Sequence, residues 1–133
     1  MRPLTTLALI LVGLTGMTQI VLGALLWTGH SLTLIPLHMQ VGYAFVVLLW
    51  ALAVLAVRDG ASSSLAGLTF AWGVIVVVSG ILQDRLLPGD AHWMINTLHL
   101  LIGLTALGLA RMLVARIPRA RPALLGSSRR GAA

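Results

Sequence analysis

Residues 3–57 read PLTTLALILVGLTGMTQIVLGALLWTGHSLTLIPLHMQVGYAFVVLLWALAVLAV, and none of these 55 positions holds Asp, Glu, Lys or Arg. As one helix the run would be about 82 Å long, whereas the hydrocarbon core of a bilayer is about 30 Å thick. The run must therefore fold back on itself, and it holds two membrane spans. Residues 28–31 (Thr-Gly-His-Ser) and Pro36 are turn signals that mark the fold-back point.

The rest of the chain repeats this alternation of apolar runs and short polar turns. An Asp-Gly pair and three serines form one turn at 59–64, and a second polar loop follows at 84–90. The sequence predicts an all-α fold, an integral membrane four-helix bundle in one domain over residues 1–115, with a basic tail at 116–133. The expected spans are 4–27, 37–57, 64–83 and 92–113.

The composition restricts both the class of protein and its chemistry. Hydrophobic residues make up 59% of the chain, charged residues only 9%, and the mean hydropathy is +1.01. Because soluble domains have about 25% charged residues, this composition excludes a soluble globular enzyme. The absence of Glu, Lys and Cys excludes glutamate chemistry, thiolate metal sites, disulfides and covalent haem attachment through CxxCH. Four His, five Met and a few amides and hydroxyls remain as potential functional groups.

The arginines predict the orientation in the membrane. In a four-helix arrangement all but one of them fall on one side, and Arg85 alone falls on the other. The positive-inside rule then places both termini in the cytoplasm, and we expect a bacterial inner membrane. We interpret the basic tail, 116–133, as a disordered segment that sets topology near lipid headgroups rather than as a nucleic-acid site.

The two halves of the chain resemble each other. Leu37-His38 is followed by Gly42, and Leu98-His99 is followed by Gly103, so both second helices carry a His and a Gly four residues later. The first and third helices carry Gly23 and Gly80 near the end that we expect to face outward. We interpret the pattern as two duplicated helical hairpins, with the two histidines in equivalent positions.

His38 and His99 are the leading candidates for a functional site, since an ionisable side chain in a span is costly and often functional. Two neutral imidazoles on facing helices of a bundle suit the axial positions of one haem iron. Gly42 and Gly103 lie one turn from each His on the same face, where a missing side chain would let a porphyrin approach the backbone. We therefore expect haem b, with Arg85 as the partner of its anionic propionates.

Three other interpretations of the polar residues stay open. His38 and His99 could each bond to a neighbouring hydroxyl or carbonyl and only hold helices together, as Gln19 and Gln40 could. His30 and His92, in or beside the outer loops, form a weaker second haem site or are solvated interface residues. Imidazole and thioether groups suit copper, and an outer copper site would draw on a set of five residues. That set is His30, His38, Met39, His92 and Met94.

The segment Gln19-Ile20-Val21-Leu22-Gly23-Ala24, the short loop and the helix opened by His38 resemble one four-helix half of heme A synthase. The helix with Leu98, His99 and Gly103 is similar too, and the resemblance covers about residues 17–46 and 92–110. It implies that His38 and His99 are axial haem ligands. The reacting half of that family has a Glu before its first His and often paired outer cysteines, and this chain has neither. The resemblance therefore points to the half that holds haem b, or to a related small four-helix b-type cytochrome.

These observations leave three functions open. The first is a b-type cytochrome that passes electrons between a quinone and an outer redox partner protein. The second is an enzyme or oxidase assembly factor of the heme A synthase type, acting as a homodimer or within a larger membrane complex. The third is a haem-free anchor or accessory subunit whose histidines only pack.

Overall fold

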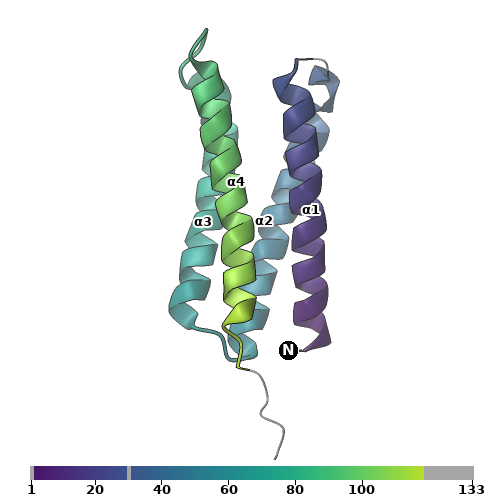
Figure 1. Cartoon of the computed structure of the whole chain (residues 1–133), viewed down its shortest axis with the longest axis vertical. Coiled ribbons are helices and arrows are strands. Elements are labelled where there is room, and N and C mark those ends of the chain that lie inside the picture. The colour runs from purple at the N-terminus through teal and green to yellow at the C-terminus, as the bar shows by residue number, and fades with distance from the viewer. Residues whose placement is uncertain (1, 30, 119–133) are drawn as a thin grey trace, which may run out of the picture.

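The computed structural model describes residues 2–29 and 31–118, and this part of the chain is all-α, as predicted. Four helices are long and apolar enough to cross a membrane, which agrees with the predicted multi-pass architecture (Figure 1). Within the described residues, two short 3-10 helices lie in the connections. In chain order the elements are α1 (Pro3–Trp27), η1 (Leu32–Leu34), α2 (Ile35–Arg58), α3 (Ser63–Leu82), η2 (Gln83–Arg85) and α4 (His92–Ala115).

Local residue choices explain where the helices begin and turn. Pro3 and Pro36 lie in the first turns of α1 and α2, where the missing N–H of proline costs no intrahelical bond. The turn from α2 to α3 needs a positive φ at Gly60, +97°, a conformation that side chains with a Cβ disfavour.

The helices form a bundle in which each packs against the next and α1 closes against α4. α2 also contacts α4 across the bundle, and this contact brings the two histidine-bearing helices together. We call the end that carries residues 28–29, 31–34 and 83–91 the loop end, and the opposite end, with Arg2 and Arg116, the terminal end. Figure 1 shows the start of α1 and the last described residues at the terminal end.

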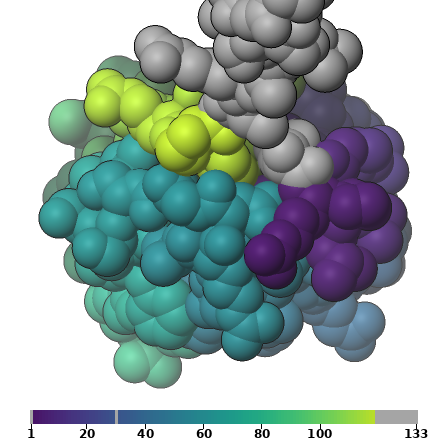
Figure 2. All heavy atoms as spheres, turned by 90° about the horizontal axis from the view of Figure 1, so that it is seen from below, coloured from purple at the N-terminus to yellow at the C-terminus, as the bar shows by residue number. Residues whose placement is uncertain are grey.

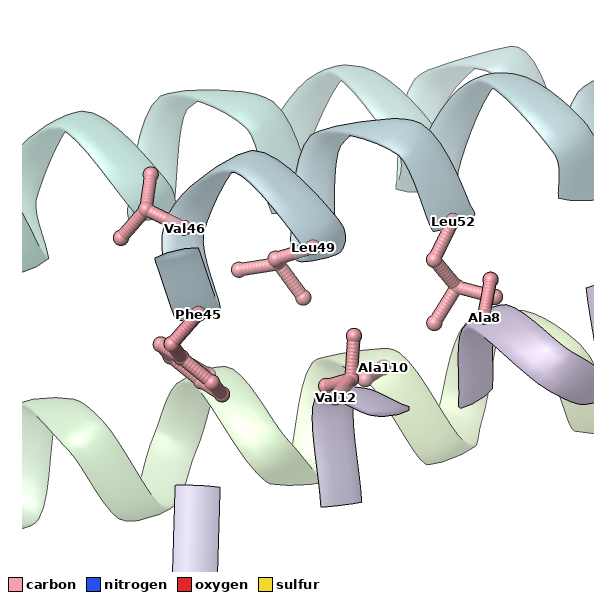
Figure 3. Packing of buried hydrophobic residues seen from close by; sticks show 8 residues of the cluster. Ala8, Val12, Phe45, Val46, Leu49, Leu52 and Ala110 are labelled. Carbon is pink, nitrogen blue, oxygen red and sulfur yellow. The ribbon is translucent and has the colours of Figure 1, made fainter. Parts of the chain in front are cut away.

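The packed core fills the terminal half of the bundle. Figure 3 shows Phe45, Leu49 and Leu52 of α2 on the side that faces small residues of the neighbouring helices, whereas Val46 of the same cluster points the other way. Those small residues are Ala8, Val12, Ala106 and Ala110. Close packing of helices through small side chains is common in membranes, where burial against lipid gives little drive.

This core stops short of both histidines. Phe45 comes seven residues after His38, and Ala106 comes seven residues after His99, which is two helical turns, about 10.5 Å, in each case. In the described part of α2 and α4, no residue between these histidines and the loop end is buried. Leu22 of α1 is buried, and it directly precedes Gly23, the glycine nearest to His38. The loop half is thus loosely packed around the histidine pair.

At the terminal end, Asp59 joins the end of α2 to the start of α1. Its Oδ2 accepts hydrogen bonds from the Arg2 backbone N–H at 2.8 Å and from the Thr5 hydroxyl at 2.9 Å. The Arg2 guanidinium lies 3.3 Å from Oδ1, and the Asp59 side chain is only 4% exposed. Because no side chain at the N-cap of α1 accepts a hydrogen bond from this helix, the Asp59 carboxylate provides an acceptor at its N-terminus.

Figure 2 looks at the terminal end, where the start of α1 and the last turn of α4 both border the turn from α2 to α3.

Candidate functional site

The structure brings His38 of α2 and His99 of α4 together at the loop half of the bundle. Their imidazole ring centres are 6.4 Å apart, and the ring planes make an angle of 58°. Both side chains are half-buried. Residues 61 positions apart in sequence thus form one pair because α2 and α4 meet across the bundle.

Each of these imidazoles lies against a glycine of the preceding helix. A methyl group added at Gly23 of α1 would lie 3.7 Å from Cε1 of His38. A methyl group added at Gly80 of α3 would lie 3.3 Å from Cε1 of His99 and 4.0 Å from its Nε2. The two hairpins therefore place each histidine against the backbone of its partner helix in the same way.

A second pair of glycines repeats at the same spacing. Gly16 and Gly73 are both buried and lie seven residues before Gly23 and Gly80. Gly16 of α1 faces Leu107 of α4, and Gly73 of α3 faces Trp50 of α2. The helices correspond when α1 is exchanged with α3 and α2 with α4, but the contacted residues do not, because Leu107 comes eight residues after His99 and Trp50 comes twelve residues after His38. The two duplicated hairpins therefore stay a prediction.

The hydrogen bonds of the two histidines differ. Nδ1 of His99 lies 3.0 Å from the hydroxyl oxygen of Ser79, and that hydroxyl donates to the Val76 carbonyl at 3.0 Å. Within the described residues, the buried Nδ1 of His38 has no hydrogen-bond partner.

Gln19 of α1 links α1 to the backbone beside His38. Its Nε2 donates to the His38 carbonyl oxygen at 3.0 Å. Its Oε1 is buried and has no partner among the residues that the structure describes. Gln19 also lies against Gly42, where an added Cβ would collide with Nε2. The amide side chain therefore occupies the space that Gly42 leaves, whereas nothing lies within 4 Å of a Cβ built at Gly103.

The other predicted residues lie apart from the pair. Arg85, in η2, is exposed at the loop end, and no ion pair within 4.0 Å engages it in residues 2–29 and 31–118. His92 begins α4, and its Nδ1 is 3.3 Å from the Leu86 carbonyl oxygen. Met39 and Met94, from the copper alternative, are exposed. His30 and the tail from 119 onward lie outside the described residues.

The pair supplies two nitrogen donors and no further ones. No group of three or more His, Cys, Asp or Glu side chains that could hold a metal ion occurs in the described part of the chain. Two donors are too few for a closed zinc site, which takes four, but they are the number needed when a porphyrin supplies the other four. Two imidazoles bonded at about 2.0 Å to opposite sides of one metal ion have ring centres about 6 to 6.5 Å apart. The separation of 6.4 Å, the donor type and the donor number therefore fit bis-His haem iron.

Sequence reasoning missed Ser79 as a neighbour of His99. A serine in an apolar helix commonly bonds to its own backbone, so it carries no signal for an interhelical contact. The spacing of the glycines gave an indirect signal. Aligning Gly16 and Gly23 with Gly73 and Gly80 marks Gly80 as the glycine that faces His99, and Ser79 is the residue directly before Gly80.

Comparisons of the chain with protein-family models, with curated proteins and with solved structures found no match.

Proposed function

We propose that this chain is an integral membrane protein that binds haem b between His38 and His99 and works in electron transfer. The observation that carries the proposal is the separation of the two imidazole ring centres, 6.4 Å. This value fits two nitrogens on opposite sides of one iron, and helices from both hairpins are needed to produce it.

The residues of the chain have separate tasks in this proposal. His38 and His99 would bind the haem iron, and Gly23 and Gly80 let the helix backbones lie close to the two rings. Haem b, when bound, supplies one-electron redox chemistry, and a bis-His iron has no open position for oxygen. The apolar helices keep the pair within the bilayer, away from bulk water.

The charges support an orientation for this protein in a bacterial inner membrane. Arg2, Arg58 and Arg116 flank or end helices at the terminal end, and Arg85 is exposed at the loop end. By the positive-inside rule the terminal end and both termini face the cytoplasm. Arg85 is then the cation available to the anionic edge of a haem, on the side where an outer redox partner would dock, while a quinone reaches the site through the bilayer.

The test is a reduced-minus-oxidised absorption spectrum of the full chain in detergent, recorded before and after haem is added. We expect the bands of a low-spin b-type haem. Either His38→Ala or His99→Ala should remove the low-spin spectrum. Gln40→Ala is the control, because Gln40 is exposed and only two residues from His38, and it should leave the spectrum intact.

Two results would overturn the proposal. The first is a folded, helical protein, verified by circular dichroism, that shows no Soret band even with added haem. The second is a haem spectrum that survives both histidine substitutions, which would place the haem elsewhere.

A further inference from the structure

The environments of the two histidines differ in one hydrogen-bonded group. Ser79 of α3 places its Oγ 3.0 Å from Nδ1 of His99. His38 of α2 has no such neighbour, and its buried Nδ1 is unpartnered among the described residues. Ser79 directly precedes Gly80, and the residue that directly precedes Gly23 in the first hairpin is Leu22. The position that corresponds to Ser79 thus holds a buried hydrocarbon side chain.

The proton balance at Ser79 determines which nitrogen of His99 carries hydrogen. The Ser79 hydroxyl has one proton, and both the Val76 carbonyl oxygen and Nδ1 of His99 lie 3.0 Å from its oxygen. A serine within a helix commonly gives this proton to a carbonyl three or four residues back, here that of Val76. The contact with His99 then requires the imidazole to donate, so Nδ1 carries the proton. In a neutral ring the other nitrogen, Nε2, is then unprotonated and has its lone pair free.

We propose that Ser79 is the positioning residue of His99, which holds the ring as the Nδ1–H tautomer and leaves Nε2 as the metal-binding atom. The two ligands are consequently unequal: His99 is the permanent ligand and His38 is the exchangeable one. This inference rests on the proposed haem site, but the tautomer of His99 is a property of the haem-free chain.

The mechanism follows from general metal-site chemistry. A metal-bound histidine that donates its second ring N–H to an acceptor is fixed in orientation and becomes a better ligand, and loss of that acceptor typically costs 10–100-fold in metal affinity. Among the residues that the structure describes, Nδ1 of His38 has no such acceptor, so no hydrogen bond there holds its ring in one tautomer.

The first experiment records ¹⁵N–¹H spectra of the ¹⁵N-histidine-labelled, haem-free full chain, with His99 assigned from the His99→Gln spectrum. We expect the Nδ1–H tautomer at His99. Ser79→Val and Ser79→Thr form an isosteric pair, since only the threonine keeps a hydroxyl. The valine variant should lose the tautomer preference and the threonine variant should keep it. An Nε2–H tautomer in the unsubstituted chain, or a preference that survives in Ser79→Val, would overturn the proposal.

The second experiment measures haem affinity. Ser79→Val should weaken binding about tenfold or more, and Ser79→Thr should restore it. His38→Gly should keep a five-coordinate haem whose low-spin spectrum returns on adding imidazole, whereas His99→Gly should lose most of the bound haem. Equal losses in the two glycine variants would contradict the assignment of unequal ligands. Failure of all variants and of the unsubstituted chain to bind haem would refute the proposed function, and the tautomer measurement would still decide the role of Ser79.

Discussion

Gly80 of α3 lies directly against the imidazole of His99 of α4, so that a Cβ built on Gly80 would be 3.3 Å from Cε1 of the ring. The corresponding approach of Gly23 to His38 is looser, at 3.7 Å, which is an ordinary van der Waals distance. The ring of His99 is therefore confined on one side by the Gly80 backbone and held at Nδ1 by Ser79.

We expect Gly80→Ala to weaken haem binding, because the new methyl group forces the His99 ring or the α3 backbone to move by a few tenths of an ångström. A displaced ligand should cost about tenfold in affinity, comparable to loss of a supporting hydrogen bond. Haem titration followed at the Soret band measures the effect. Gly108→Ala is the control, since Gly108 lies on α4 nine residues after His99 and nothing lies within 4 Å of its Cβ position, so the affinity of this variant should be unchanged. Equal affinities of the two variants would show that the Gly80 contact does not position the ring.

The spans were predictable from the sequence because each is bounded by charges, prolines or glycines. The predicted spans of 4–27 and 37–57 correspond to the helices Pro3–Trp27 and Ile35–Arg58. The 3-10 turns η1 and η2 were not predicted, since single turns depend on how the chain meets its neighbours rather than on apolar periodicity.

The candidate site was only partly predictable. The pairing of His38 with His99 was predicted from the repeated Leu-His and Gly pattern, and the structure brings the two rings together. The hydrogen bonds of Ser79 and Gln19 do not follow, because they depend on helix rotation and depth, which the sequence pattern leaves free. Gly42 illustrates this: the missing side chain was visible in the sequence, but the Gln19 side chain that lies there was not.

Gly73 is a position where the close approach of two helices can be tested. An added Cβ would lie 2.5 Å from Nε1 of Trp50, whose ring stacks on Phe70 at 4.6 Å and whose Nε1 donates to the Phe70 carbonyl oxygen. Because the indole is held by both contacts, Gly73→Ala should destabilise the protein by about 1–3 kcal/mol. Thermal unfolding in detergent, with tryptophan emission as the second readout, measures this.

Gly67, on the same helix, gives the control for that prediction. Nothing lies within 4 Å of a Cβ at Gly67, so Gly67→Ala should not lower the unfolding temperature. If both alanine variants unfold at the temperature of the unsubstituted protein, α2 and α3 are not packed through Gly73.

The proposed orientation predicts the outcome of reporter fusions. Arginines gather at the terminal end, so a reporter that is active only outside the cytoplasm should be inactive when fused after Ala133. The same reporter placed after Gly89, in the connection before α4, should be active. Activities in the reverse order would invert the topology and move Arg85 to the cytoplasmic side.

The link between Asp59 and the start of α1 predicts how stability depends on pH. The backbone N–H of Arg2 donates to the carboxylate of Asp59 and lowers its pKa below the ordinary value of 3.8. Burial of the carboxylate raises this pKa, but the Thr5 hydroxyl and the charge of Arg2 lower it further. A carboxyl whose pKa is lower in the folded state stabilises that state above its unfolded pKa, and this contribution is lost as the pH falls through the folded pKa. The unfolding temperature of the protein in detergent should therefore fall as the pH is lowered below about 4.

Asp59→Asn should unfold at a lower temperature than the unsubstituted protein at pH 7, and it should lose most of this acid dependence. Asp84→Asn, at the exposed loop end, should keep it. If the acid dependence persists in Asp59→Asn, the contacts of Asp59 with Arg2 and Thr5 do not fasten α1 to α2.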